Sequence, residues 1–216
     1  MIKKNKINIA ILISGRGSNL QKIIKESKKK NYPAEIRIVI SNRQNAKGLD
    51  FAKRNNISTL VISDFKYKNK NLFEKKISDA LNKKNIDLIC LAGFMKVLSA
   101  QFVKKWNKKV INIHPSLLPK FKGLSVHERV IKSRQKISGC TVHFVNKKVD
   151  SGLIIVQGKV RVKKNDNSEK LAKRILKLEH YCYPLAIKLL AEKKFQTKTK
   201  KSRKIKRNVS INRKFF

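Results

Sequence analysis

The spacing of apolar segments in the first 115 residues constrains the fold of this chain more than any other feature. Short apolar runs alternate there with longer amphipathic stretches, and the runs are Ile7–Ile13, Glu35–Ile40, Thr59–Ile62, Leu88–Ala92 and Val110–Ile113. This alternation predicts β-strands joined through helices, and hence a parallel sheet. Continuous apolar runs are typical of strands covered on both faces. We expect an α/β fold with a Rossmann-like, mostly parallel sheet flanked by helices.

The pattern changes after the proline-containing segment 115–119. The runs Ile137–Val145 and Gly152–Val162 predict a pair of β-strands, and a long helix is expected from about Ser168 to Leu190. Ser168 is expected to cap this helix, and Pro184 to kink or break its C-terminal part. A C-terminal β pair and a long helix therefore complete the expected fold.

The chain is strongly basic, with 54 Lys and Arg against 13 Asp and Glu and a formal net charge of +41. Such a charge concentrates any anion, from nucleic acid to a phosphorylated metabolite. The lysines are spread over the whole chain among many Asn and Ile, so we expect genomic base composition to contribute as much to the excess as selection for binding. Residues 193–216 hold eleven Lys or Arg and no acidic residue. We expect a catalytic domain over 1–192 and a basic, disordered tail over 193–216, with contact to RNA or another polyanion as its functional alternative.

Cysteine and histidine spacing exclude several classes of protein. Cys90, Cys140 and Cys182 are far apart in apolar stretches, which favours free thiols in a reducing, cytoplasmic compartment. No Cys-x-x-Cys or His-x-x-x-His spacing occurs, so we expect no metal site.

The basic start followed by Ile7–Ile13 resembles a signal peptide, but no cleavage site follows, and we interpret it as the first strand. No apolar run approaches the roughly 20 residues that span a bilayer.

The segment 112–119, Asn-Ile-His-Pro-Ser-Leu-Leu-Pro, points to chemistry. Asn112 and His114 share one face at the carboxyl end of an expected strand, the edge where open α/β sheets bind ligands. The carboxamide can donate to an oxyanion and the imidazole can transfer a proton. Asp150, in the turn of the β pair, can stabilise the protonated ring and raise its pKa. A structural histidine and an ordinary turn aspartate are the alternatives.

A second segment, Ser14-Gly-Arg-Gly-Ser-Asn19, joins the first strand to the first helix. Its glycines allow close backbone approach, and a helix N-terminus offers N–H groups and a positive dipole end, which predicts an anion site. Leu20 replaces the third glycine of a dinucleotide fingerprint, and the lysine of a P-loop is absent. A single phosphate is therefore favoured over NAD or ATP, with a plain tight turn as the alternative.

Five segments in order, over about Lys6 to Lys193, resemble one known family. They are Gly15–Leu20, Leu91–Met95, Asn112–Pro119, Gly139–Val145 with Asp150, and Glu179-His180. Together they resemble the folate-dependent phosphoribosylglycinamide formyltransferases of purine biosynthesis. The resemblance implies the formyltransferase fold and transfer of a formyl group from 10-formyltetrahydrofolate, as co-substrate, to the amine of phosphoribosylglycinamide, with no metal.

The resemblance also implies a role for each matching residue. His114 would be the proton donor, Asn112 would stabilise the tetrahedral intermediate, and Asp150 would raise the pKa of His114. The ribonucleotide would contact Gly17, Ser18, Asn19 and Glu179, and the folate would contact Lys70, Met95, Lys96, Val97, Leu98 and Asn112. Lys70 and Lys96 stand where the family often has Arg, which puts bidentate contacts there in doubt, and Leu176 replaces a polar residue.

Other functions stay open at this point. A formyl-folate hydrolase and a methionyl-tRNA formyltransferase belong to the same superfamily, but each usually carries an additional domain, and the loop Gly15–Asn19 favours a ribonucleotide substrate. A basic RNA-binding protein is the alternative of a different class, although we find no aromatic-studded basic sheet and no helix-turn-helix signature. The expected partners are small-molecule substrates and no membrane, with the protein a monomer or homodimer.

Overall fold

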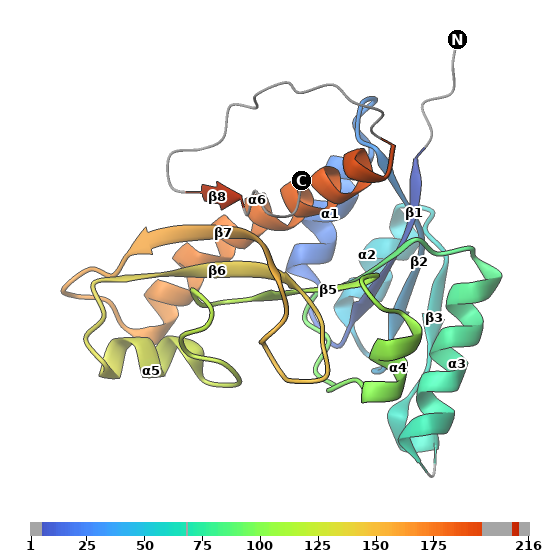
Figure 1. Ribbon diagram of the computed structural model, residues 1–216, viewed down its shortest axis with the longest axis horizontal. Coiled ribbons are helices and arrows are strands. Elements are labelled where there is room, and N and C mark those ends of the chain that lie inside the picture. The colour runs from blue at the N-terminus through green and yellow to red at the C-terminus, as the bar shows by residue number, and fades with distance from the viewer. Residues whose placement is uncertain (1–5, 68, 196–208, 212–216) are drawn as a thin grey trace. The chain divides into compact units, whose positions relative to one another are not determined.

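The computed structural model describes residues 6–67, 69–195 and 209–211. Its strands are hydrogen-bonded in the order β3-β2-β1-β4-β5-β6-β7-β8. The chain divides into two compact units, Met1–Asn112 and Ile113–Phe216, and each is described by itself below (Figure 1). Among the described residues, no helix is long and apolar enough to cross a membrane.

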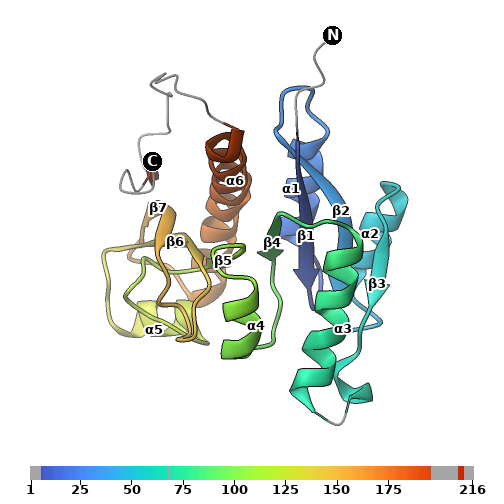
Figure 2. The same ribbon diagram turned by 45° about the vertical axis from the view of Figure 1, so that its right-hand side comes forward.

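The first unit is a parallel sheet with helices on both faces. Its strands are β1 (Ile7–Ile13), β2 (Ala34–Ser41), β3 (Thr59–Val61) and β4 (Leu88–Leu91), and β5 (Val110–His114), which crosses into the second unit, pairs with β4. Its helices are α1 (Ser18–Ser27), α2 (Lys47–Arg54), η1 (Asp64–Lys66), α3 (Lys70–Lys83) and α4 (Ala100–Lys105). The chain adds β2 and β3 on one side of β1 and then returns to add β4 on the other side. Because the crossover connections between parallel strands are right-handed, this reversal places α1 and α2 on one face of the sheet and α3 on the other (Figure 2).

Strand β1 lies at the centre of this sheet, between β2 and β4. Ile9, Ile11 and Ile13 are completely buried, and so are Ala10 and Leu12, which face the opposite side. The continuous apolar run is therefore explained by helices that cover both faces of the strand. Its carboxyl end, together with those of β2, β3 and β4, presents loops along one edge of the unit, as a parallel sheet requires.

The second unit combines antiparallel strands with a long helix. It holds α5 (Val126–Lys132), β6 (Ile137–Phe144), β7 (Ile154–Arg161), α6 (Ser168–Phe195) and β8 (Val209–Ile211). Strand β7 pairs antiparallel with β6 on one side and with β8 on the other, and α6 packs against β6 and β7. A Cβ on Gly158 would lie 2.6 Å from Leu178 of α6, so glycine at this position lets the helix approach the strands closely.

The expected fold class and the expected strands are confirmed, with differences of one or two residues at their ends. The expected N-cap of α6 is wrong, and of the expected kink or break at Pro184 the break is wrong. Ser168 is the first helical residue, while the Oδ1 of Asn167 accepts a hydrogen bond from Lys170 N at 2.8 Å and caps the helix. The helix also continues through Pro184 to Phe195. Tyr183 and Ile187, on either side of the proline, are completely buried, and this packing outweighs the loss of one backbone hydrogen bond.

The proposed division into a domain over 1–192 and a tail over 193–216 stays a prediction. Helix α6 extends three residues past the proposed boundary, and Val209–Ile211 forms β8. The expected disorder of the tail falls mainly on 196–208 and 212–216, which lie outside the described residues.

Candidate active site

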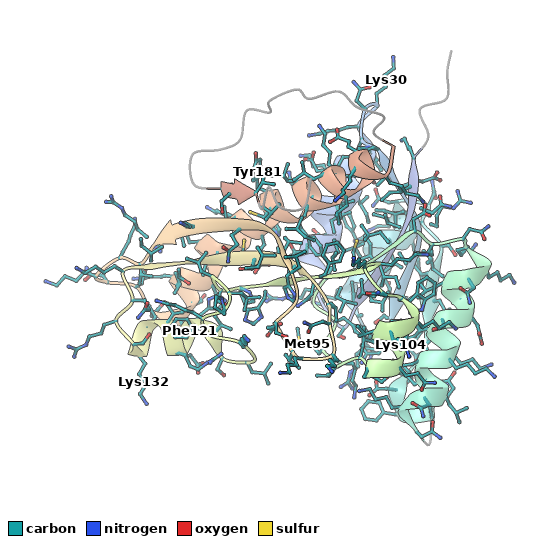
Figure 3. The ribbon with its side chains drawn as sticks, in the orientation of Figure 1. Lys30, Met95, Lys104, Phe121, Lys132 and Tyr181 are labelled. Atoms are coloured by element: carbon teal, nitrogen blue, oxygen red, sulfur yellow. The ribbon has the colours of Figure 1, made fainter. Side chains whose placement is uncertain are left out.

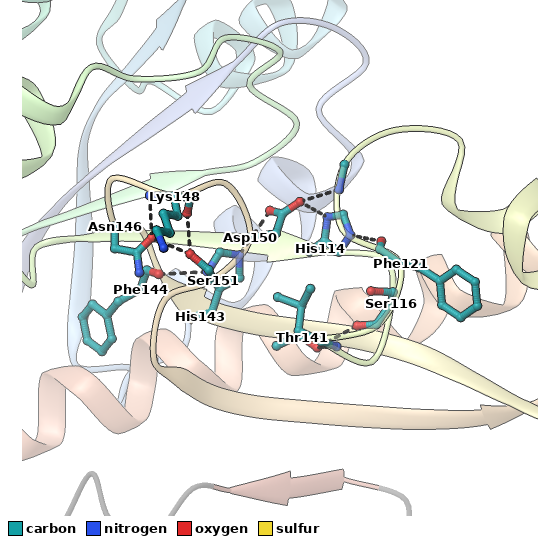
Figure 4. Close-up of polar contacts among 12 residues, drawn as sticks. His114, Ser116, Phe121, Thr141, His143, Phe144, Asn146, Lys148, Asp150 and Ser151 are labelled. Atoms are coloured by element: carbon teal, nitrogen blue, oxygen red, sulfur yellow. Dashed lines mark hydrogen bonds and ion pairs between the residues drawn. The ribbon is translucent and has the colours of Figure 1, made fainter.

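Asp150 of the second unit lies between two imidazoles (Figure 4). Its Oδ2 is 3.2 Å from Nδ1 of His114, at the end of β5, and its Oδ1 is 3.6 Å from Nε2 of His143, near the end of β6. The side chains of His114, His143 and Asp150 are 7%, 2% and 8% exposed. One carboxylate therefore faces two titratable rings in a site that is nearly closed to water.

The turn between β6 and β7 carries Asp150 to this position. Asp150 has a φ of +47°, in the left-handed region, and its Oδ2 accepts a hydrogen bond from Gly123 N at 2.9 Å. A Cβ on Gly152 would lie 1.6 Å from the carbonyl oxygen of Phe144, so the turn folds tightly against the end of β6. Ser151 Oγ lies 2.7 Å from the carbonyl oxygen of Lys148, within the same turn. The backbone thus holds the carboxylate against the histidines.

Each imidazole has one nitrogen on a backbone carbonyl and the other toward Asp150. Nε2 of His114 lies 2.8 Å from the carbonyl oxygen of Phe121, and Nδ1 of His143 lies 2.8 Å from that of Phe144. A carbonyl only accepts, so each of these nitrogens carries a hydrogen. A proton on the remaining nitrogen would face the carboxylate in both rings. The geometry therefore accommodates an imidazolium beside Asp150.

The pKa of His114 nevertheless lies below its ordinary value of 6.5. Burial lowers it most, the Phe121 carbonyl and Asp150 raise it, and His143 and Arg129 lower it again. The carboxylate raises the pKa of His114, as the sequence predicted, but burial outweighs this effect and the net pKa is lowered. The pKa of Asp150 is also lowered, because His143, the Gly123 N–H and His114 together outweigh the effect of burial. The resting site therefore pairs an ionised carboxylate with a neutral imidazole at neutral pH.

The loop that supplies the Phe121 carbonyl is itself held firmly. Arg129 donates from Nη2 to the carbonyl oxygen of Lys122 at 2.5 Å and from Nε to that of Leu124 at 3.0 Å. Phe121 and Ser125 have left-handed φ values of +56° and +51°. These contacts fix the position of the group that binds Nε2 of His114.

Asn112 precedes His114 by two residues on β5, so the two side chains project from the same face of the strand. Its backbone is in register with Leu91 of β4. Asn112 is partly exposed. A carboxamide on this face could donate to an oxyanion formed beside the imidazole.

The predicted anion loop of the first unit stands where two helices begin. Gly17 has a φ of +72°, and α1 starts at the next residue, Ser18, followed by the buried Asn19. Gly48, in the first turn of α2, donates from its N–H to the carbonyl oxygen of Gly15 at 3.1 Å. A Cβ on Gly17 would lie 2.9 Å from the Cα of Gly48, so only glycine allows this approach. The N-termini of both helices, which favour an anion, therefore meet at the loop.

A chain of polar contacts ties together the loops that follow β1, β2, β3 and β4; we call it the loop network, and it consists of Ser14, Asn42, Asp64, Met95 and Lys96. Met95 N donates to Ser14 Oγ at 2.8 Å, and Ser14 Oγ donates to Asn42 Oδ1 at 2.5 Å. Asn42 Nδ2 donates to Asp64 Oδ1 at 3.0 Å, and Asp64 Oδ2 pairs with the ammonium of Lys96. The segment proposed to bind folate is thus anchored at its start.

The same segment is anchored at its end by Glu74 of α3. Ser99 caps α4, and its N–H donates to Glu74 Oε1 at 2.7 Å while its hydroxyl donates to Oε2. Between the two anchors, Met95 and Val97 are 69% and 63% exposed, whereas Leu98 is buried (Figure 3 labels Met95). Exposed apolar side chains on a fixed loop offer a surface to a flat, partly apolar ligand.

The other residues named from the sequence lie on helices. Lys70 is the first residue of α3 and is exposed; Glu179 and Leu176 lie on α6, the first buried and the second partly exposed. Sequence reasoning had not assigned a site role to His143, Gly48 or Glu74, or to Asn42 and Asp64 of the loop network. His143 stood within the segment 139–145 that carried the family resemblance, and this was the one available signal for it.

Comparison with known proteins assigns the class. Residues 7–187 match the formyl transferase family, so this chain belongs to that family. The names of individual relatives identify a more specific activity within that family. A phosphoribosylglycinamide formyltransferase from Haemophilus influenzae is 42% identical over 190 residues, which is 88% of this chain and 90% of that protein. The crystal structure of phosphoribosylglycinamide formyltransferase from Anaplasma phagocytophilum has a TM-score of 0.83 and 44% identity, covering 88% of each chain.

A second kind of relative is much longer. The human trifunctional purine biosynthetic protein adenosine-3 is 48% identical over 189 residues, which is 88% of this chain. The chain spans only 19% of the length of that relative.

Proposed function

We propose that this protein transfers the formyl group of 10-formyltetrahydrofolate to the amine of N1-(5-phosphoribosyl)glycinamide, giving the N-formyl product and tetrahydrofolate in purine biosynthesis. The observation that supports this proposal most strongly is the ionised Asp150 beside the neutral His114, which lies at the end of a strand that also bears Asn112. This arrangement stands in a chain that is 42% identical to a named phosphoribosylglycinamide formyltransferase over most of both lengths.

The transfer passes through one oxyanion and moves one proton from the attacking nitrogen to the folate nitrogen. Attack of the amine on the formyl carbon gives a tetrahedral intermediate, whose oxyanion accepts a hydrogen bond from the Asn112 carboxamide. The attacking nitrogen must lose a proton and the folate nitrogen must gain one, and His114 relays it. Asp150 stabilises the imidazolium that forms in between. Because both ring nitrogens of His114 are occupied, substrate must displace either the Phe121 carbonyl or Asp150 from one of them.

Each substrate has its own proposed contacts. The phosphate of the ribonucleotide accepts from N–H groups of Gly17, Ser18 and Asn19, where the N-termini of α1 and α2 meet, and Glu179 lies near the ribose. The folate lies against Met95, Lys96, Val97 and Leu98, with a further contact from Lys70. As lysines, Lys70 and Lys96 offer a point charge to a carboxylate rather than a bidentate pair.

A spectrophotometric assay of the purified protein tests this function. Tetrahydrofolate should form only when both the formyl donor and the ribonucleotide are present. Formation without the ribonucleotide would identify a hydrolase of the same superfamily. In His114→Ala, turnover should fall by about 10²–10⁴, the range for a lost acid–base group; unchanged turnover would refute the assignment of His114.

Some expectations on partners stay proposals of the same kind. We propose a cytoplasmic enzyme that acts as a monomer or homodimer. Contact of the basic residues 193–216 with a polyanion also stays a prediction, since most of that segment lies outside the described residues.

A further inference from the structure

A glutamine of β7 and a threonine of β6 bind the loop that follows β5 in the second unit. Gln157 and Thr141 are directly opposite each other in the antiparallel pair, so their side chains share one face of the sheet. Gln157 Nε2 donates to Thr141 Oγ1 at 2.9 Å and to the carbonyl oxygen of Leu118 at 3.0 Å. Thr141 is completely buried, and Leu118 is buried as well. We call Gln157 and Thr141 the amide–hydroxyl pair.

The Thr141 hydroxyl uses its full hydrogen-bonding capacity in this arrangement. A hydroxyl has one hydrogen and two lone pairs. The hydrogen goes to the carbonyl oxygen of Ser116 at 2.6 Å, and the lone pairs accept from Leu118 N at 3.1 Å and from the glutamine amide (Figure 4 labels Thr141 and Ser116). The Leu118 carbonyl also only accepts. Residue 157 must therefore supply two hydrogens, which an amide does and an ionised carboxylate of the same size cannot.

The amide–hydroxyl pair restrains the loop that carries the Phe121 carbonyl. Within this loop, Ser116 Oγ donates to the carbonyl oxygen of Lys120 at 2.6 Å. The carbonyl oxygen of the next residue, Phe121, lies 2.8 Å from Nε2 of His114. The amide–hydroxyl pair thus holds the loop before Phe121, while Arg129 holds it after Phe121. Removal of the first restraint allows the carbonyl to move relative to the imidazole.

We propose that Gln157 is a positioning residue for the proton transfer: through the amide–hydroxyl pair it holds the Phe121 carbonyl against Nε2 of His114 and fixes the orientation of the imidazole. This inference rests on the proposed function, in which His114 relays the proton. Gln157 acts through the loop and needs no contact with either substrate.

The other charged or titratable groups that act on His114 lie outside the amide–hydroxyl pair. They are Asp150 in the turn after β6, His143 in β6, and Arg129 and His127 in α5. Burial lowers the pKa of His114 most, and the hydrogen bond to the loop carbonyl is the first of the influences that raise it. If that hydrogen bond is weakened while the other groups stay in place, the pKa should fall further.

The test measures formyl transfer as a function of pH in Gln157→Met, which keeps the length of the side chain and removes both donated hydrogen bonds. The value of kcat should fall by about tenfold, the scale of one lost hydrogen bond, while both KM values stay within about twofold of the wild type. The acid limb of kcat/KM reports the essential base of the free enzyme, so it should move to lower pH. Because every variant receives the same substrates, a shift of this limb comes from the enzyme.

Two further variants separate positioning from a loss of folded protein. Thr141→Val removes the hydroxyl of the amide–hydroxyl pair and should move the acid limb in the same direction. The double variant should lose little more rate than the more affected single variant, since both substitutions act on one loop. Gln135→Met is the matched control, because Gln135 Nε2 donates to the carbonyl oxygen of Ser133 at 3.4 Å in the exposed turn after α5. It should behave as the wild type.

A loss of folded protein would scale the pH profile down without moving its acid limb. An unmoved limb in both Gln157→Met and Thr141→Val would therefore overturn the inference, and so would an equal shift in Gln135→Met. If the wild-type protein shows no transfer, the proposed function fails, and NMR titration of the His114 ring then decides the inference separately. The pKa of His114 must be lower in Gln157→Met than in the wild type and unchanged in Gln135→Met.

Discussion

Replacing Asp150 by Asn removes the charge between the two imidazoles while keeping the shape of the side chain. The amide oxygen can still accept from Gly123 N, so the turn that carries residue 150 should keep its conformation. The pKa of His114 should then fall further below 6.5, because the lowering influences of burial, His143 and Arg129 stay while one of the two raising influences is lost. His143→Asn should do the opposite: its Nδ2 can replace Nδ1 on the Phe144 carbonyl, but the lowering influence of His143 on the pKa of His114 disappears.

The expected loss of rate follows from the distance between the charges. Asp150 Oδ2 and His114 Nδ1 are 3.2 Å apart, and both side chains are less than a tenth exposed. Unit charges about 4 Å apart attract by roughly 4 kcal/mol at an effective dielectric constant of 20. Since each 1.36 kcal/mol is tenfold in rate, Asp150→Asn should reduce kcat/KM by up to about 10³. His143→Asn should stay within about tenfold of the wild type, because it leaves the His114–Asp150 pair intact.

The assay is formyl transfer as a function of pH, together with NMR titration of the His114 ring. Asp166→Asn is the matched control, because Asp166 is also a buried, ion-paired carboxylate of the second unit, bound to Arg174 at 2.6 Å and away from the histidines. It should alter stability but not turnover. A rate for Asp150→Asn within tenfold of the wild type would refute the reasoning, as would a shift of the His114 pKa in the same direction in both site variants.

Three further predictions concern stability and the substrate sites. The pKa of Asp166 is lowered to about 2, mainly by its hydrogen bond from Arg174, so the unfolded chain binds more protons than the folded one between the ordinary value of 3.8 and about 2. The stability difference between wild type and Asp166→Asn in urea melts should therefore be largest above pH 4 and vanish as pH falls through 2; a constant difference would contradict this. Glu74→Gln loses one of two acceptors for Ser99 and should raise the folate KM about threefold to tenfold, leaving the ribonucleotide KM unchanged in initial-rate assays. Gly48→Ala places a Cβ 2.6 Å from Ile13 Cδ1 and 3.3 Å from both Gly15 O and the Cα of Gly17, so it should disturb the loop and raise the ribonucleotide KM instead; an effect on the folate KM alone would argue against the phosphate loop.

The sheet was predictable from the sequence because a strand that is buried on both faces is a continuous apolar run. Every residue of β1 from Ile9 to Ile13 is completely buried, and the run is apolar without interruption. The carboxyl end of β5 was predictable for a related reason, since alternation along a strand puts Asn112 and His114 on one face. The Asn167 cap of α6 was equally local, but Ser168 offered the same chemistry one residue later.

The rest of the site depends on tertiary structure. In the sequence, His143 lies in an apolar stretch, which is typical of a buried structural residue. Only the folded chain shows that the turn after β6 brings Asp150 back to it. That turn needs a left-handed backbone conformation at Asp150 and a glycine at position 152. Neither requirement can be predicted from the spacing of hydrophobic residues. The raising effect of Asp150 on the pKa of His114 was expected, but the larger lowering effect of burial depends on the folded chain and leaves no signal in the sequence.

The loop network has a consequence for the order and cooperativity of binding. Ser14 directly precedes the proposed phosphate loop, and its hydroxyl also holds the backbone of Met95 in the proposed folate loop. A ligand that immobilises either loop therefore lowers the conformational entropy that the other must lose. By thermodynamic reciprocity the gain in affinity is the same whichever ligand binds first. If the two loops bind the proposed ligands, we therefore expect this shared serine hydroxyl to make each ligand favour the binding of the other, with no need for a large conformational change.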